Sequence, residues 1–128
     1  MDTTGILKAI IAPHAGFTYS GPTAAWAYKN VEPSLYDRVV LLGPSHSLPF
    51  QQLGLTSCQE WATPLGNLPV LTSWCQKLYE TKTDAFLVLP KKAEENEHSL
   101  EMHLPFIQKI FKDAGKEVEL LPIMVGQV

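Results

Sequence analysis

Two short stretches with the same order of residues limit what this chain can fold into. Residues 10–16 (IIAPHAG) and 39–46 (VVLLGPSH) each run through apolar residues, reach a proline and continue to a histidine. An apolar run rich in Ile and Val that stops at Gly or Pro is typical of a strand buried on both faces of a parallel sheet. We therefore expect an α/β fold with a mainly parallel sheet flanked by helices.

The two histidines fall just past the carboxyl ends of these predicted strands. In open α/β sheets this is the edge at which ligands bind. Neighbouring parallel strands would bring His14 and His46 together there, and neutral imidazole is a common metal ligand. The sequence therefore predicts a metal site at His14 and His46. Two imidazoles need a third ligand, either a carboxylate to complete a facial triad or a thiolate for a softer metal.

Other side chains near these loops are candidates for the same pocket. Glu97 and Glu101 are the nearby carboxylates. His98 and His103 lie close to them in the sequence, and either histidine could orient a ligand instead of binding the metal itself. His98 and His103 are five residues apart and do not share a helix face, so at most one of them points into the pocket. Ser45 lies beside His46, but no G-x-S-x-G elbow supports a serine hydrolase. The pocket candidates are Tyr19, Ser45, Glu97, His98, Glu101 and His103.

The remaining pattern predicts alternating strands and helices along the chain. Ser20 or Gly21 is expected to cap the first helix, with Pro22 in its first turn. Pro105 is acceptable only near the start of the last helix, and Gly115 suits its end. The first helix should connect two parallel strands in a right-handed crossover. The predicted strands are 6–12, 37–42, 53–57, 84–90 and 117–125, the predicted helices are 20–30, 68–80 and 99–114, and residues 60–64 are predicted to turn.

Length and charge restrict the class of protein further. A single domain over residues 1–128 is expected from the length. The net charge of −3 gives no electrostatic case for nucleic acid or an anionic membrane. No apolar run approaches the ~20 residues of a membrane-spanning helix, and the first residues do not resemble a signal peptide. Cys58 and Cys75 lack a C-x-x-C pattern and are expected to be free thiols.

Four stretches together resemble the Memo family, which is named for mediating cell motility downstream of a receptor tyrosine kinase. They are residues 9–21, 42–46, 97–105 and 121–126, ordered and spaced as in that family. The resemblance implies a fold related to the class III extradiol dioxygenases, here incomplete and equal to roughly the N-terminal half of a Memo-type domain. It also implies that His14 and His46 match the two metal-ligand histidines. The third ligand, a cysteine in Memo and a glutamate in the dioxygenases, comes from the C-terminal half.

The function that this resemblance implies is a cytoplasmic or nuclear role in signalling and cell motility, with a metal-binding, redox-linked pocket for copper or iron. Two alternatives remain: an oxygenase-type enzyme with a non-haem metal, and a metal-free module that binds protein partners such as phosphotyrosine peptides. Without the third ligand, we expect the metal to be absent or weakly bound and the chain to be catalytically silent. We also expect an exposed sheet edge beyond residues 118–125 to promote self-association or to leave the chain marginally stable.

Overall fold

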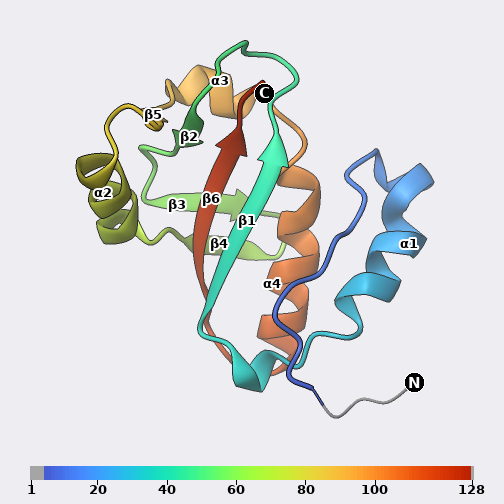
Figure 1. Cartoon of the computed structure of the whole chain (residues 1–128). Coiled ribbons are helices and arrows are strands. Elements are labelled where there is room, and N and C mark those ends of the chain that lie inside the picture. The colour runs from blue at the N-terminus through green and yellow to red at the C-terminus, as the bar shows by residue number, and fades with distance from the viewer. Residues whose placement is uncertain (1–4, 128) are drawn as a thin grey trace.

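The strand β6 (Glu119–Val125) forms the middle of the sheet and is buried along most of its length. In the computed structural model, which describes residues 5–127, β6 pairs in parallel with β1 (Arg38–Pro44) (Figure 1). On its other side it pairs antiparallel with β2 (Leu53–Leu55), which pairs in parallel with β5 (Phe86–Val88). The strand order β1–β6–β2–β5, with two parallel pairings and one antiparallel pairing, confirms the predicted α/β fold with a mainly parallel sheet.

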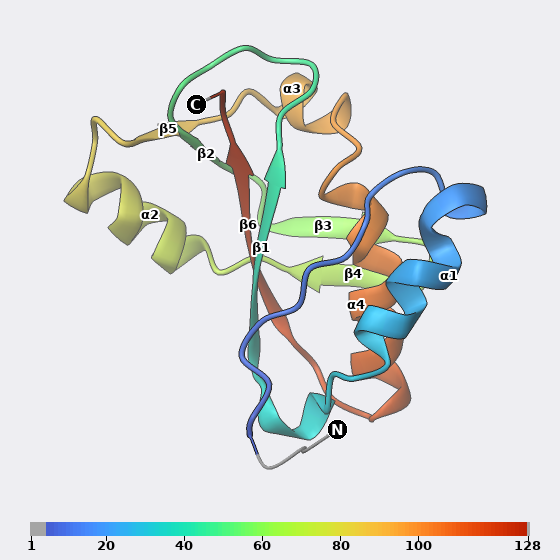
Figure 2. The ribbon, with the colours of Figure 1, turned by 45° about the vertical axis from the view of Figure 1, so that its right-hand side comes forward.

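Helices cover both faces of this sheet, because β6 presents apolar side chains to each. Helix α4 (Leu104–Asp113) lies against one face with α1 (Phe17–Tyr28) beside it, and α2 (Thr72–Thr81) lies on the other side (Figure 2). Side chains alternate along a strand, so successive residues of β6 enter different cores. Leu120 and Met124 belong to the core under α4, and Leu121 and Ile123 belong to the core under α2.

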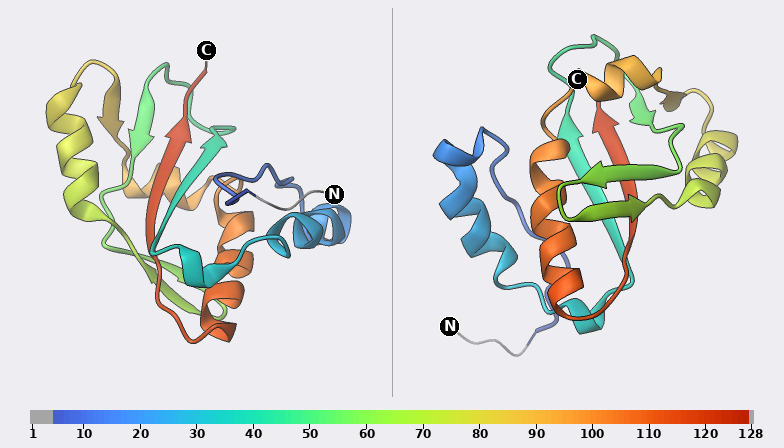
Figure 3. Two further views of the ribbon diagram at one scale, coloured as in Figure 1. Left: turned by 60° about the horizontal axis from the view of Figure 1, so that its bottom comes forward. Right: turned by 180° about the vertical axis from the view of Figure 1, so that it is seen from behind.

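Short elements complete the fold and correct two sequence predictions. Residues 60–64 were predicted as a turn, but β3 (Glu60–Thr63) and β4 (Gly66–Pro69) form a hairpin on the side of the sheet that α4 covers (Figure 3). Because Leu68 and Pro69 belong to β4, the predicted helix 68–80 begins only at Thr72. Strands of four residues contain too little alternation to be recognised by pattern. The remaining elements are η1 (Pro33–Leu35), α3 (Lys91–Glu95) and η2 (Glu101–His103).

The predicted strand at residues 6–12 is absent. Within residues 5–127, no backbone hydrogen bond joins residues 6–12 to another segment, and Ile11 is 99% exposed. The parallel partner of β1 is β6, so the predicted crossover between residues 6–12 and 37–42 does not form. Helix α1 also starts earlier than predicted, at Phe17, which places Pro22 inside the helix and removes one helical hydrogen bond there.

The last helix begins at Leu104, five residues later than predicted, but Pro105 and Gly115 lie at its ends as expected. Pro105 lies in the first turn of α4, where its missing N–H costs little. At the other end, Gly115 takes a positive φ of 66°, and the amide of Lys116 donates to the carbonyl of Phe111 at 3.0 Å. This is the usual way in which glycine ends a helix.

The free edges of the sheet are not where the sequence suggested. Since β6 is an inner strand, the prediction of an exposed edge beyond residues 118–125 is wrong, and β1 and β5 are the edge strands. On β1, Val40 and Leu42 are 53% and 60% exposed, so apolar side chains do face solvent at one of these edges. Among the described residues, no helix is long and apolar enough to cross a membrane.

Candidate metal centre

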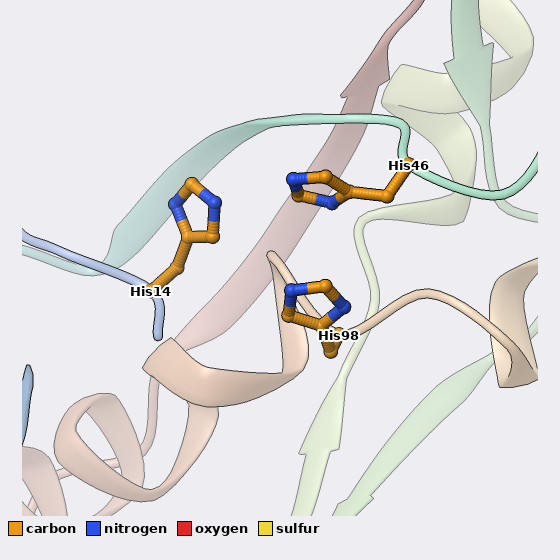
Figure 4. Close-up of side chains that lie close together, drawn as sticks. All are labelled: His14, His46 and His98. Atoms are coloured by element: carbon orange, nitrogen blue, oxygen red, sulfur yellow. The ribbon is translucent and has the colours of Figure 1, made fainter. Parts of the chain in front are cut away.

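Three histidines from three separate segments converge at the carboxyl end of β1. His14 follows the extended N-terminal segment, His46 lies in the loop after β1, and His98 lies between α3 and η2 (Figure 4). The ring centroid of His46 is 5.3 Å from that of His14 and 4.5 Å from that of His98. One ring nitrogen from each residue lies within 4.8 Å of the other two, so a single ion could contact all three.

The proximity of His14 and His46 was predicted from the sequence, although their strands do not pair. The loop at residues 13–16 still ends beside the carboxyl end of β1, which is where the prediction placed it. His98 was only a candidate for the pocket, and the structure adds it to the cluster. Whether the three histidines bind a metal stays a prediction.

Glu97 holds two of the three histidine segments in place. Its side chain is only 2% exposed, and its Oε1 lies 2.7 Å from Nδ1 of His46. The same carboxylate accepts a hydrogen bond from the backbone amide of His46 and others from the amides of His98 and Ser99, at 3.0 and 3.1 Å. One buried carboxylate therefore joins the loop after β1 to the segment that carries His98.

The ionisation of Glu97 decides which nitrogen of His46 carries the proton. Burial by itself raises the pKa of Glu97, but hydrogen bonds from the amide and ring of His46 and from the amide of Ser99 outweigh it and lower the pKa to about 2. Because an ionised carboxylate only accepts hydrogen bonds, Nδ1 of His46 must be protonated. The neutral ring then keeps an unprotonated Nε2, the nitrogen that a metal requires.

A glycine allows the His98 segment to approach the end of β1. A Cβ on Gly43 would lie 2.7 Å from Cδ2 of Leu100 and 3.0 Å from Oγ of Ser99. The hydroxyl of Ser99 in turn donates to the carbonyl of Pro44 at 2.7 Å. The glycine of the G-P-S-H stretch therefore serves the close packing that places His98 beside His46.

Other sequence candidates lie outside the cluster. Tyr19 is 85% exposed on α1, and Glu101 is exposed in η2. The hydroxyl of Ser45 donates to the carbonyl of Leu48 within its own loop at 2.7 Å. Glu97, a candidate ligand, instead orients His46. The role of Glu97 follows from its four hydrogen-bond donors, which only the fold brings together.

His103, the fourth histidine, is buried away from the cluster. Its Nδ1 lies 2.9 Å from the hydroxyl of Tyr28. Burial, and to a smaller extent the charge of His14, lowers the pKa of His103, while burial raises the pKa of Tyr28. The phenol therefore stays protonated near neutral pH and can donate to the neutral ring.

This burial predicts that acid destabilises the chain through His103. Its pKa in the fold lies below the unfolded value of about 6.5, so the stabilisation is complete above that pH and decreases as the pH falls below it. The free energy of unfolding should fall by up to about 1.4 kcal/mol per pH unit from this group. Urea denaturation between about pH 7.5 and 5 measures the slope. The variant His103→Gln should have a smaller slope, and an unchanged slope would contradict the assignment.

The donor set fits a transition-metal ion. Imidazole suits zinc, copper, iron and nickel, and three protein ligands leave a coordination position open. Three nitrogens about 2.0–2.1 Å from one ion would lie roughly 3.3 Å apart, so nitrogens that now lie up to 4.8 Å apart need to approach by up to about 1.5 Å. His98 can rotate to achieve this, because its side chain is partly exposed, while Glu97 holds the ring of His46.

Comparison with known proteins gives a consistent result. A family model described as Memo-like protein matches residues 3–128. The chain is 43% identical to Protein MEMO1 of Danio rerio over 124 residues and 43% identical to Protein MEMO1 of Homo sapiens over 121 residues. It is 40% identical to the Protein memo-1 homolog of Caenorhabditis elegans. These matches cover 95%, 93% and 97% of this chain but only 40%, 39% and 34% of the relatives. The chain therefore spans about two fifths of their length.

Proposed function

This chain belongs to the Memo family, and on that premise we propose that it binds one transition-metal ion through His14, His46 and His98. The observation that supports the proposal is the convergence of three imidazoles from segments that are far apart in the sequence. A buried carboxylate that fixes the proton of one imidazole is a usual companion of a metal-binding histidine.

The residues of this chain would hold and orient the ion. Glu97 keeps Nε2 of His46 unprotonated, and the Ser99–Pro44 contact fixes the position of His98. All three ligands are neutral, and two are partly exposed, so we expect the ion to exchange readily with chelators. Copper or iron, the metals that the family resemblance implies, would supply one-electron redox chemistry when bound.

We propose that this chain has a role in cytoplasmic signalling and cell motility. Support comes from the 43% identity to vertebrate relatives named Protein MEMO1. Two other functions use the same surface: a non-haem-metal oxygenase and a metal-free module for protein partners. Turnover of a catechol under oxygen would favour the oxygenase, and failure to bind metal would favour the interaction module.

Metal titration tests the proposed site. Copper(I), iron(II) and zinc(II) are each titrated into the chelator-treated chain, and binding is followed by competition with a chromophoric chelator. We expect one ion per chain for at least one metal. Each of His14→Ala, His46→Ala and His98→Ala should weaken binding by about tenfold or more, because each removes one of three ligands. NMR of the histidine ring nitrogens should show Nε2 of His46 at the metal.

The fourth histidine is the matched control for this titration. His103→Gln leaves the cluster intact and should bind metal as tightly as the unmodified chain, because His103 bonds to Tyr28 instead. Stoichiometric binding that survives the double variant His14→Ala, His46→Ala would place the metal elsewhere and reject the proposed site.

A further inference from the structure

A cleft between β1 and the N-terminal segment is not explained by the histidine cluster. It has a volume of about 580 Å³, with residues 7–12 as one wall and residues 38–42 of β1 as the other. Tyr28 of α1 and Ile107 and Ile110 of α4 line it on the side of the helices. About twenty waters would occupy such a volume, and most of the lining is apolar.

Both walls of the cleft are extended backbone with free hydrogen-bonding groups. Two hydrogen bonds mark the ends of β1. The carbonyl of Asp37 accepts one from the amide of Glu119, and the amide of Ser45 donates one to the carbonyl of Val125. Because backbone groups alternate sides along a strand, the odd-numbered residues of β1 face β6 and the even-numbered ones face the cleft. Arg38, Val40 and Leu42 therefore turn their backbone groups toward the opening.

The opposite wall is equally unpaired. Within residues 5–127, no backbone hydrogen bond to another segment is made by residues 7–12, and only the carbonyl of Leu7 accepts from a side chain, the hydroxyl of Tyr36. Each wall is five or six residues long, which corresponds to roughly 17–20 Å of extended chain. An inserted strand of that length could therefore pair with both walls at once.

The side chains around the cleft indicate what kind of strand fits. Toward α4 the cleft is lined by Ile107 and Ile110, and on the solvent side Ile11, Val40 and Leu42 are exposed. A strand with apolar side chains on both faces would cover both sets. This is the composition of an inner strand of a parallel sheet. The charged residues that line the cleft are Lys8 and Arg38, and the rest of its lining is mostly apolar, so a strongly polar peptide finds few partners there.

We propose that this cleft accepts an extended apolar segment from the part of a Memo domain that this chain does not match. The matched relatives are about two and a half times as long as the aligned region, so most of their domain lies outside it. The inserted segment would form a strand between residues 7–12 and β1 and would cover the exposed apolar residues. This inference does not depend on metal binding.

The test uses peptides of about twelve residues that tile the unmatched part of human Protein MEMO1. Amide hydrogen exchange of the 128-residue chain is measured by NMR with and without each peptide. At least one apolar peptide should bind. It should slow amide exchange about tenfold or more at Arg38, Val40 and Leu42, and it should also slow exchange at the amides of residues 7–12. Val40→Pro should lower the affinity for that peptide about tenfold or more, because proline removes an N–H that faces the cleft and obstructs the new strand.

Val88→Pro on the other edge strand is the matched control. The amide of Leu89 donates to Leu55, so Val88 turns its backbone groups away from β2, and its side chain is about as exposed as that of Val40. This variant should bind the peptide with the same affinity as the unmodified chain. The proposal is overturned if no peptide protects these amides, or if Val40 is already protected in the free chain because residues 6–12 pair with β1. A dimer that Val40→Pro abolishes, without peptide binding, would assign the cleft to a second copy instead.

Discussion

Replacing Glu97 with glutamine should damage both the histidine cluster and the fold. Glu97 accepts four hydrogen bonds with its two oxygens, from the amides of His46, His98 and Ser99 and from the ring of His46. A glutamine has only one oxygen, so its NH₂ group must face at least one of these donors. We expect the free energy of unfolding to fall by about 2–4 kcal/mol, because buried donors lose a charged acceptor.

The same change should either reverse the tautomer of His46 or displace its loop. If the glutamine NH₂ faces the ring, Nδ1 becomes the acceptor and Nε2 takes the proton, so Nε2 can no longer bind a metal. If the NH₂ faces the backbone amide of His46 instead, two donors repel each other and displace the loop. Both arrangements predict a loss of metal affinity of about 10- to 100-fold.

Urea denaturation and the metal titration measure these two effects separately. Glu95→Gln is the matched control, because Glu95 is exposed and forms only a surface ion pair with Lys91. It should change stability by less than about 0.5 kcal/mol and leave metal affinity unchanged. A Glu97→Gln chain that is as stable as the Glu95→Gln chain would show that the carboxylate does not hold the cluster.

The parts of the fold that the sequence predicted are those whose signals are local. The predicted strands 37–42 and 117–125 contain the apolar runs 39–42 and 120–125, and both form long strands in the sheet. Pro105 and Gly115 marked the two ends of α4, because each has one energetically favourable position at a helix end.

Strand pairing could not be predicted in the same way. Residues 10–12 have the composition of a buried strand, but whether they become one depends on a partner, and β1 pairs with β6 instead. Pro122 is a second example, since proline in an inner strand usually argues against that assignment. It is tolerated because its nitrogen points to the side where β2 has already ended at Leu55, opposite Ile123.

The candidate site shows the same difference between residues with a local sequence signal and residues that only the fold brings together. His14 and His46 were found because each follows an apolar run and a proline, whereas His98 lies in a polar segment with no such signal. The role of Glu97 depends on contacts with a residue 51 positions away, which a single sequence does not show. An acidic residue before a histidine was the only available indication, and it suggested a ligand where the structure has an orienting group.

The core under α4 leads to the second large effect, the response to Leu120→Ala. Leu120 is fully buried in the middle of the sheet, where it packs with residues of α4 such as Ile107 and Phe111. Removing its side chain leaves a cavity that neighbours from both the sheet and α4 cannot fill, so the free energy of unfolding should fall by about 2–5 kcal/mol. Because domains of this size are stable by only about 5–15 kcal/mol, this loss is a large fraction of the total and should lower the melting temperature by roughly 5 °C or more.

The matched control is Leu42→Ala, the same substitution on the neighbouring strand. Leu42 is 60% exposed, so its truncation removes few contacts and should cost less than about 1 kcal/mol in the isolated chain. Thermal and urea denaturation of both variants measure the difference. Equal losses in the two variants would mean that the core under α4 is not packed as described. A much larger loss at Leu42 would mean that this side chain is buried in solution, by residues 6–12 or by a second molecule.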